Sequence, residues 1–412
     1  MSAPARVLVV GAGIVGTCCA VYLQREGFRV TLIDRDGPGE GCSSGNAGNF
    51  SVGSVFPQSM PGIWRKVPGM LMDPLLPLSI RWRHLPAALP WFTRFTMNSR
   101  RRRVEEIGLA LKALYGHVLD AYDALLKSAG AQDLIVCRGR LTTYESELSL
   151  QKDAYALELR RRHGIDVQIL SGDEARKMEP ALTPLVKRAA FLPAYAHTVN
   201  PLRLTQVLAE QFVRDGGTVL RETVRGFEAK DPGPPRVLTD TGGHDAEQVV
   251  IAAGAYSGRM AAQLGSRVLL EAERGYHLSM SDPGVTFTRT IMSSDRFITI
   301  TQMEPGLRVS GISEFSGLDA PPRYRLADVV LKHARDLIPD LNPAGASRWM
   351  GNRPSTPDSL PIISRSPHNP NVLFAFGHFG LTLGAISGKL IAEMATGRPT
   401  TIDTTPYRVD RF

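Results

Sequence analysis

The chain has 412 residues, of which 43% are hydrophobic and 21% are charged. This composition is typical of a folded globular protein, and the lack of repeats and low-complexity tracts in the sequence excludes a repeat protein or an extensively disordered chain. The length exceeds what one compact core holds, so we expect two domains with room for a buried ligand between them. The formal net charge is +8, and its basic excess gathers in residues 61–103.

The cysteine spacing and the N-terminal sequence bear on the cellular compartment. The cysteines at positions 18, 19, 42 and 137 have no CxxC or Cys/His ligand spacing, which predicts reduced thiols and no metal site. Residues 7–23 carry no charge, as in a signal peptide or a membrane span. This run is short, however, and contains three regularly spaced glycines. We therefore expect a cytoplasmic protein.

A dinucleotide-binding unit is predicted at the start of the chain. Arg6–Val10 predicts a buried parallel strand, Ile14–Arg25 predicts a helix, and Phe28–Ile33 predicts a second strand that leads to Asp34. The turn between the first strand and the helix has the GxGxxG spacing.

Each glycine of this turn has a physical purpose. Gly11 permits the tight turn, Gly13 lets the backbone approach a pyrophosphate, and Gly16 lets the helix pack on the strand. Asp34 would accept a hydrogen bond from a ribose hydroxyl and repel a 2′-phosphate, which favours FAD or NAD over NADP. A glycine-rich turn without a ligand is the alternative, but the complete strand, helix, strand and acid favour a dinucleotide site.

Further elements follow downstream. The apolar run Gln248–Ala255 contains the small residues Ala253 and Gly254, as a backbone passing close to a cofactor requires; an ordinary buried strand fits equally well. Helical spacing of apolar residues extends over residues 104–125. Other predicted elements are a helix over Thr205–Arg214 and strands over Thr218–Glu222, Arg236–Thr239, Glu247–Ala252, Leu269–Met280 and Phe297–Ile312.

Two motifs lie near the C-terminus. Residues 351–362 read GNRPSTPDSLPI, and residues 376–384 read FGHFGLTLG. Together with the glycine fingerprint and the strand at Val249–Gly254, they resemble the D-amino-acid oxidase-like flavoproteins. Residues 43–48, SSGNAG, resemble an element of the bacterial D-amino-acid dehydrogenases within that family. The resemblance covers almost the whole chain.

The resemblance implies an α/β protein that binds FAD non-covalently. A discontinuous Rossmann-like FAD-binding domain would take residues 1–60, 186–266 and 346–412, and an inserted α+β substrate domain on an antiparallel sheet would take residues 104–185 and 267–345. The strands expected between residues 218 and 252 suit the family's strand meander. The expected cofactor contacts are Gly11, Gly13, Ile14, Val15, Gly16, Asp34, Arg35, Ser43, Ser44, Asn46, Ala47, Gly48, Val224, Ala253, Gly254, Gly351, His378, Gly380, Leu381 and Thr382.

Amine oxidation by a flavin requires the protein chiefly to position the substrate. An arginine can grip a planar carboxylate through two parallel hydrogen bonds, and the resemblance implies this role for Arg353. From local sequence alone, a salt bridge to Asp358 is favoured. Tyr276 lies where relatives place a substrate-facing aromatic residue, although a plain strand tyrosine fits as well. His378, the third catalytic candidate beside Arg353 and Tyr276, lies in the segment that resembles the flavin-contacting turn, where the N–H groups of residues 380–382 would stabilise reduced flavin.

One position departs from the family pattern. Some amino-acid oxidases of the family carry a second arginine after the Gly-His-Phe element, where this chain has Gly380 and Leu381. We therefore expect a single-arginine clamp, which would favour bulkier or more apolar substrates.

The segment of residues 61–103 is basic and rich in tryptophan and proline. It has nine Lys or Arg residues against one acid, and it contains Trp64, Trp82 and Trp91. This composition suits a bilayer interface, while a lid or a subunit interface fits as well. Nucleic acid is not an expected partner, because no recognition module accompanies the charge. Membrane contact would place the protein peripherally on the cytoplasmic membrane face, with a quinone or the respiratory chain as electron acceptor.

We therefore expect an FAD-dependent D-amino-acid dehydrogenase acting on a small amino-acid substrate, with an oxidase as an open variant. Hydride would pass from the α-carbon to flavin N5, giving an imine and then a 2-oxo acid. One alternative is the oxidation of cyclic secondary amino acids such as D-proline or cis-4-hydroxy-D-proline. Another is a flavin-binding membrane or subunit partner with little turnover.

Overall fold

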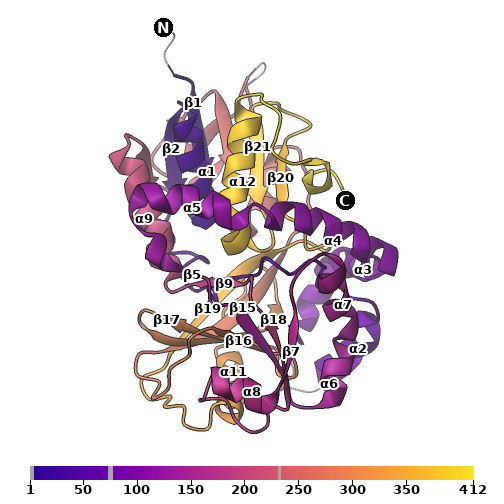
Figure 1. The fold of residues 1–412 in the computed structure, drawn as a ribbon. Coiled ribbons are helices and arrows are strands. Elements are labelled where there is room, and N and C mark those ends of the chain that lie inside the picture. Colours follow the sequence, from indigo (N-terminus) through magenta and orange to yellow (C-terminus); the bar gives the residue numbers. More distant parts are fainter. Residues whose placement is uncertain (1–3, 73–77, 231–232) are drawn as a thin grey trace.

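Two β-sheets form the upper and lower parts of the molecule in the computed structural model, which describes residues 4–72, 78–230 and 233–412 (Figure 1). The upper sheet has six strands in the order β10-β2-β1-β14-β21-β20. Their bounds are β10 (Thr218–Arg221), β2 (Arg29–Asp34), β1 (Arg6–Val10), β14 (Gln248–Ile251), β21 (Val372–Phe376) and β20 (Ile362–Arg365). Neighbours are parallel except β20 and β21. The turn after central β1 therefore leaves at the carboxyl edge, where such sheets bind dinucleotides.

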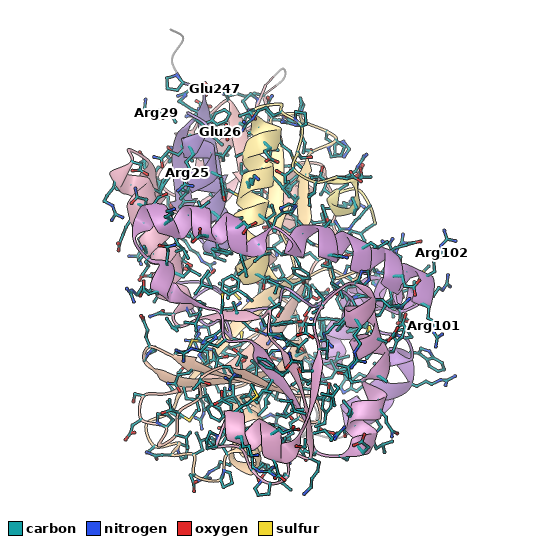
Figure 2. The ribbon with its side chains drawn as sticks, viewed as in Figure 1. Arg25, Glu26, Arg29, Arg101, Arg102 and Glu247 are labelled. Carbon is teal, nitrogen blue, oxygen red and sulfur yellow. The ribbon has the colours of Figure 1, made fainter. Side chains whose placement is uncertain are left out.

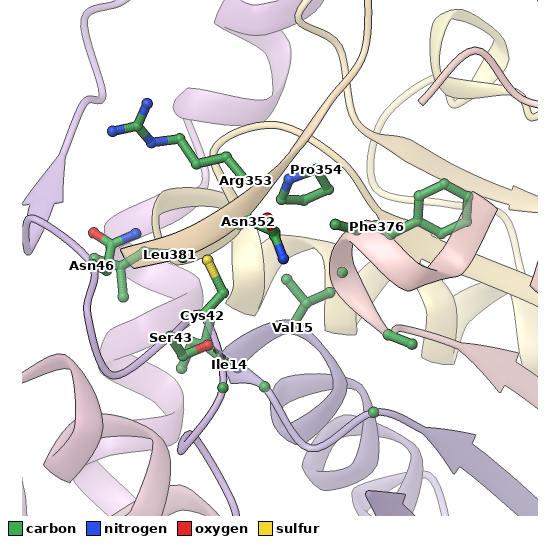
Figure 3. A pocket seen from close by; sticks show the side chains of 18 of the residues that line it. Ile14, Val15, Cys42, Ser43, Asn46, Asn352, Arg353, Pro354, Phe376 and Leu381 are labelled. Atoms are coloured by element: carbon green, nitrogen blue, oxygen red, sulfur yellow. Dashed lines mark hydrogen bonds between the residues drawn. The ribbon is translucent and has the colours of Figure 1, made fainter. Parts of the chain in front are cut away.

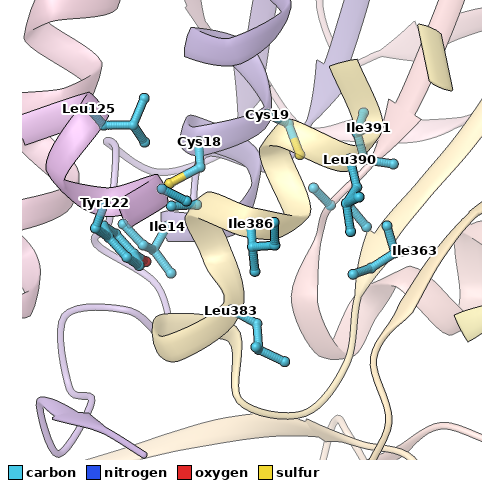
Figure 4. Packing of buried hydrophobic residues seen from close by; sticks show 14 of the residues in the cluster. Ile14, Cys18, Cys19, Tyr122, Leu125, Ile363, Leu383, Ile386, Leu390 and Ile391 are labelled. Atoms are coloured by element: carbon cyan, nitrogen blue, oxygen red, sulfur yellow. The ribbon is translucent and has the colours of Figure 1, made fainter. Parts of the chain in front are cut away.

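Two closely packed helices, α1 (Ile14–Arg25) and α12 (Gly380–Ala395), cover one face of this sheet. A Cβ on Gly388 of α12 would lie 2.6 Å from the Cys18 carbonyl carbon, so the glycine allows the close approach. Figure 4 shows Cys18, Ile386 and Leu390 in the core between the helices. α5 (Val118–Ala129) and α9 (Pro201–Arg214) pack outside them. Buried nearly all round, α1 has no charged residue before Arg25.

The lower sheet has nine strands and carries the substrate half of the molecule. Its order is β19-β15-β18-β17-β16-β6-β8-β7, with β4 beside β18. The bounds are β19 (Ser347–Ser355), β15 (Glu271–Met280), β18 (Gly306–Phe315), β17 (Ile298–Met303), β16 (Thr290–Ser293), β6 (Arg140–Tyr144), β8 (Arg188–Leu192), β7 (Gln168–Ser171) and β4 (Leu78–Ile80). One face packs apolar residues such as Leu278 and Val309 against α11 (Arg325–Leu337).

The remaining elements complete the two parts. They are β3 (Asn49–Phe50), β5 (Ile135–Val136), β9 (Ala196–Thr198), β11 (Val224–Glu228), β12 (Arg236–Thr239), β13 (Gly243–His244), α2 (Ile63–Met72), α3 (Leu85–Met97), α4 (Arg101–Tyr115), α6 (Glu147–Lys152), α7 (Ala154–Arg162), α8 (Gly172–Met178), α10 (Ser257–Gln263), and the 3-10 turns η1 (Trp82–His84), η2 (Gln132–Leu134), η3 (Gly254–Tyr256) and η4 (Thr405–Tyr407).

The predicted fold class is confirmed, but the expected strand meander is divided between two sheets. Thr218–Glu222 and Glu247–Ala252 correspond to β10 and β14 of the parallel sheet, and only Arg236–Thr239 lies in the small antiparallel sheet. The buried run of β14 is typical of a central parallel strand. β10 is a half-exposed edge strand, and its pattern does not distinguish parallel from antiparallel pairing.

Two predicted elements are each two elements in the structure. The stretch Phe297–Ile312 forms the hairpin β17-β18, because Gly306, with φ +124°, turns the chain back. The helical pattern over residues 104–125 is interrupted at Gly116 and His117 between α4 and α5. Its apolar positions are buried core, as expected.

The sheets also differ from the expected domain boundaries. β8, within residues 186–266, and β19, within residues 346–412, lie in the lower sheet rather than with the FAD-binding strands. Both pair with neighbours of the substrate sheet, β8 with β6 and β19 with β15. These strand pairs join residues that are far apart in sequence. A domain boundary placed along the sequence therefore does not show which sheet each strand joins.

The basic segment 61–103, apart from residues 73–77, which lie outside the described chain, docks on the lower sheet. β4 pairs with β18, and the Trp91 indole N–H donates to the Ser355 carbonyl at 2.9 Å. Trp91 is 3% exposed, whereas Trp64 and Trp82 are 56% and 68% exposed. In the described part of the chain, no helix is both long and apolar enough to cross a membrane.

Candidate active site

A cavity of about 660 Å³ lies between the carboxyl edge of the upper sheet and the polar face of the lower sheet (Figure 3). Its upper wall is formed by the turns after β1, β2, β14 and β21, and its lower wall by β15, β17, β18 and β19. Figure 3 shows Asn352 and Arg353 leaving β19 in different directions, as successive residues of a strand do. Most of the residues expected from the sequence at a cofactor or substrate site meet at this cavity.

The glycine turn forms one end of the cavity. Gly11 has φ +108°, and a Cβ there would lie 2.5 Å from the Ala252 carbonyl oxygen, so only glycine fits. A Cβ on Gly16 would overlap the Gly11 carbonyl oxygen, which explains this glycine by helix packing. α1 begins directly behind the turn, and its Ile14 N–H donates to Ser43 Oγ at 3.0 Å. A helix N-terminus and a bare backbone together suit a pyrophosphate.

Asp34 lies at the end of β2 on the same wall. Its carboxylate accepts hydrogen bonds from the N–H groups of Ala12, at 2.6 Å, and Asp36, at 3.1 Å. Burial raises its pKa, and the two backbone donors oppose that shift. Next to it, the Arg35 guanidinium lies over the Tyr256 ring, 4.5 Å from the ring centroid. Asp34, Arg35 and Tyr256 all line the cavity.

The other end of the cavity is formed by the N-terminus of α12. Phe379 has φ 59°, and residues 380–382 of the first helical turn line the cavity. Three buried polar groups in the wall have no hydrogen-bond partner among the described residues: Asn49 Oδ1, Asn352 Oδ1 and both ring nitrogens of His378. Buried polar atoms are seldom left unpaired, and these atoms, together with the glycine turn, fit FAD.

Arg353 projects from β19 beside Glu273 of β15. Its Nη1 lies 3.0 Å from Glu273 Oε1 and donates to the Ile312 carbonyl oxygen at 3.3 Å. Its Nε and Nη2 have no hydrogen-bond partner in the described chain. A guanidinium held by one nitrogen leaves its other edge available to a carboxylate. The alternative partner, Asp358, is instead paired with Arg411 at 2.8 Å.

Glu273 and His378 are both almost completely buried, with side chains 3% and 5% exposed. Their nearest atoms, Oε2 and Nε2, are 3.8 Å apart. Burial raises the pKa of Glu273, but Arg353, His378 and two serine hydroxyls outweigh it, so the net shift is downward. Burial lowers the pKa of His378, and the Arg353 charge adds to this effect against the opposing Glu273 charge. The resting site therefore holds a carboxylate beside a neutral imidazole.

Tyr276 lines the cavity, but its hydroxyl is engaged elsewhere. The hydroxyl donates to Glu314 Oε2 at 2.6 Å and accepts from the Arg323 N–H at 3.1 Å. Burial, followed by the Glu314 hydrogen bond, raises the pKa of Tyr276 to about 12. The hydroxyl therefore braces the far side of β15, which agrees with the plain strand tyrosine left open above.

The expected cofactor contacts divide into two groups. Those that line the cavity are Gly11, Gly13, Ile14, Val15, Asp34, Arg35, Ser43, Asn46, Ala47, Val224, Ala253, Gly254, Gly351, His378, Gly380, Leu381 and Thr382. Gly16, Ser44 and Gly48 lie behind the wall. Ser44 Oγ donates to the Gly41 carbonyl at 2.9 Å, and Gly48, with φ +77°, turns the backbone.

Sequence reasoning missed several groups at the substrate end. Glu273 is one, and His277, which stacks on Trp349 with ring centroids 4.8 Å apart, is another. Arg308, half-buried and without an acidic partner in the described chain, donates to the carbonyls of Ser44 and Asn46 at 2.9 and 2.6 Å. For Glu273, the available signal was the charge of residues 271–274 within the predicted strand Leu269–Met280.

This combination defines a class of protein, namely an oxidoreductase with a nucleotide-binding sheet above a mainly antiparallel substrate sheet, in which only the pairs β16–β6 and β18–β4 are parallel among the described strands. Among the described residues, no group of three or more His, Cys, Asp or Glu side chains could hold a metal ion. Residues 6–394 match the FAD-dependent oxidoreductase family, and the chain belongs to that family.

Individual relatives match nearly the full length. A D-amino-acid oxidase of Bradyrhizobium diazoefficiens is 35% identical over 98% of each chain. A D-amino acid dehydrogenase of Vibrio vulnificus is 30% identical over 95% of this chain and 96% of its own. The crystal structure of glycine oxidase from Geobacillus kaustophilus superposes with a TM-score of 0.77 over 99% of both chains at 22% identity, which shows a shared fold.

Proposed function

We propose that the protein oxidises D-amino acids with FAD to an imine, which water converts to a 2-oxo acid and ammonia. The observation that carries this proposal is Arg353, which lines the cavity with Nε and Nη2 free of partners in the described chain. A planar anion matches that edge. The full-length relatives named for D-amino acids support the choice of substrate class and stereochemistry.

The roles of the residues follow from their places around the cavity. Bound FAD supplies the two-electron acceptor for the hydride of the α-carbon. The turn at Gly11 and the N-terminus of α1 would hold the pyrophosphate, and Asp34 would hold a ribose hydroxyl. The N–H groups at the start of α12 would face the flavin, where a helix N-terminus stabilises negative charge. Arg353 would hold the substrate carboxylate.

A panel of D- and L-amino acids with an artificial electron acceptor tests the proposal. Formation of 2-oxo acid from D-isomers, at rates far above those for L-isomers, is the expected result. Equal rates for the two enantiomers, or turnover of L-isomers alone, would contradict it. FAD binding without turnover of any member of the panel would favour the non-catalytic flavin-binding partner.

Cyclic secondary amino acids such as D-proline or cis-4-hydroxy-D-proline are a second candidate substrate class. They carry the same carboxylate, and Arg353 does not distinguish them from primary amines. The products separate the two classes, because a primary amine releases ammonia on hydrolysis of its imine, whereas a ring keeps its nitrogen. Equal yields of ammonia and reduced acceptor are expected for the primary class, and reduced acceptor without ammonia would favour the cyclic class.

For the segment of residues 61–103 we propose contact with an anionic membrane surface and transfer of electrons to a quinone. Its exposed apolar side chains include Trp64, Trp82 and Leu89, the last 57% exposed. Exposed cations stand among them, and Figure 2 shows Arg101 and Arg102, the last part of this segment, projecting from the first turn of α4. Indole rings and guanidinium groups together suit the headgroup region of a bilayer.

Co-sedimentation with vesicles tests the membrane proposal. The protein should be retained on anionic vesicles at low salt and released at high salt, because the attraction is screened. A Trp64→Ala/Trp82→Ala double variant should lose most of the retention. Leu148→Ala is the matched control, since Leu148 is 58% exposed and lies outside the segment. Absence of retention of the wild-type protein at low salt would overturn the proposal and favour a lid or subunit interface.

A further inference from the structure

A buried carboxylate links the two groups that the proposed function places at the substrate end. Glu273 Oε1 is 3.0 Å from Arg353 Nη1, and Glu273 Oε2 is 3.8 Å from His378 Nε2. Glu273 lies behind the cavity wall, while Arg353 and His378 line it. Oε2 and both nitrogens of His378 have no hydrogen-bond partner in the described part of the chain. Two buried ionisable groups, Glu273 and His378, this close to a partly exposed guanidinium need a chemical reason.

The proposed reaction supplies that reason. At neutral pH an amino acid carries an ammonium group, and hydride leaves the α-carbon readily only when the nitrogen has its lone pair. A proton must therefore pass to the protein or to solvent before oxidation. Among the described residues that line the cavity, His378 is a neutral, unpartnered base beside the Arg353 clamp.

We propose that His378 takes the ammonium proton of the bound amino acid, and that Glu273 is a positioning residue that orients Arg353 and stabilises the imidazolium formed. This rests on the proposed function. In the step, one N–H bond of the substrate breaks and one N–H bond forms on the imidazole, while no electrons change hands. Glu273 is nearest to Nε2, which favours the tautomer with hydrogen there and leaves the lone pair of Nδ1 to accept the proton.

The charges around His378 determine the expected pH profile. Glu273 faces it from β15, Arg353 faces it from β19, and Asp358, paired with Arg411, acts on it from the following loop. Glu273 and Asp358 favour the imidazolium, whereas burial and Arg353 oppose it. Removing the Glu273 charge should therefore move the acid limb of kcat/KM to lower pH, because protonation of His378 becomes harder.

The experiment compares pH profiles of the FAD-loaded wild type with three variants. Glu273→Gln should shift the acid limb to lower pH and raise KM about tenfold or more, because Arg353 loses a charged hydrogen-bond partner. In the wild type, kcat/KM should reach a plateau above the acid limb of its pH profile. In His378→Gln this plateau should be absent, and kcat/KM should rise about tenfold per pH unit as the substrate amine itself deprotonates. Glu271→Gln is the control, since Glu271 lies on the same strand and pairs with a different histidine, His84, at 2.9 Å.

A second readout does not depend on turnover. Binding of benzoate, a carboxylate without an amine, can be followed by the change in flavin absorbance. Glu273→Gln should weaken this binding about tenfold, while His378→Gln should leave it unchanged. A purely structural Glu273 would lower thermal stability without moving the acid limb.

The outcomes are distinct. A wild type that oxidises no amino acid removes the proposed function itself. A wild type that turns over, with a Glu273→Gln variant of unchanged pH profile and unchanged benzoate affinity, overturns this inference alone. If Glu273→Gln does not fold, the His378→Gln profile decides, and a wild-type plateau in that variant overturns the inference.

Discussion

The two walls of the cavity are built in different ways. The upper wall consists largely of backbone, with glycines at positions 11 and 13 and the N-termini of α1 and α12. The lower wall consists of charged and aromatic side chains, including Arg353, His277 and Trp349, carried by strands distant in sequence. The dinucleotide cofactor is long and is the same molecule in every turnover, so backbone dipoles suffice to hold it. An amino acid is small, and its recognition requires individually placed side chains.

This difference predicts different sensitivities to substitution. Changes in the lower wall should alter kinetics while FAD stays bound, whereas changes in the upper wall should alter FAD binding first. The predictions below test that separation, from the largest expected effect to the smallest.

Arg353→Lys should have the largest effect. Lysine keeps the charge but loses the planar pair of donors, so kcat/KM should fall about 100-fold or more, mainly through KM. FAD content should not change, because the residue lies in the lower wall. Steady-state kinetics and the flavin absorbance of the purified variant measure the two quantities. Unchanged saturation kinetics would remove Arg353 from the site.

Gly11→Ala should weaken FAD binding about tenfold or more. The new Cβ would lie 2.5 Å from the Ala252 carbonyl oxygen, and φ +108° disfavours any side chain. Gly27→Ala is a matched control, because Gly27 also has a positive φ, +86°, but no neighbour lies within 4 Å of its Cβ. That control should lose about 1 kcal/mol of stability and keep its FAD affinity. Fluorescence titration of the apoprotein with FAD measures the effect, and equal affinities in both variants would contradict the account.

Lowering the pH should lower the free energy of unfolding of the protein, because His277 in the lower wall is buried in its neutral form. Burial, assisted by Arg308, lowers the pKa of His277 to about 3. The unfolded chain then binds the proton more readily below pH 6.5, so the free energy of unfolding falls as pH falls. Between pH 7 and pH 5 this loss is about 2 kcal/mol. Urea unfolding at both pH values measures it. His277→Gln should reduce the difference, and an unchanged pH dependence would contradict the assignment.

Trp91→Phe should have the smallest effect. The substitution removes the indole hydrogen bond to the Ser355 carbonyl and costs about 1 kcal/mol of stability. Trp82→Phe is the control, because Trp82 is 68% exposed, and its cost should stay within about 0.5 kcal/mol. Thermal unfolding compares the two. Equal melting temperatures would show that Trp91 does not anchor the segment of residues 61–103 to the lower sheet.

The upper wall could be predicted well from the sequence. The helix Ile14–Arg25 and the strand Arg6–Val10 have the predicted bounds, because each is specified by residues close together in the chain. The GxGxxG spacing reflects positions where the backbone leaves no room for a side chain, and the structure shows this at Gly11 and Gly16. Information of this local kind can be read in one pass along a single sequence.

The lower wall could be predicted only in part. Arg353 was expected through a family motif, but its partner Glu273 precedes it by 80 residues and is brought to it by pairing of β15 with β19. For the Tyr276 hydroxyl, a substrate-facing role and a plain strand role were both open from the sequence; it donates to Glu314, because alternation along β15 points it to the opposite face. Strand register determines both outcomes, and a single sequence does not reveal it.

Anaerobic titration of the purified FAD-loaded protein tests the central claim most directly. D- and L-amino acids are added in turn while the oxidised flavin band near ~450 nm is followed. Bleaching by D-amino acids, with L-isomers leaving the band intact, is the result that this account predicts. A band that persists with every D-amino acid tested would contradict it.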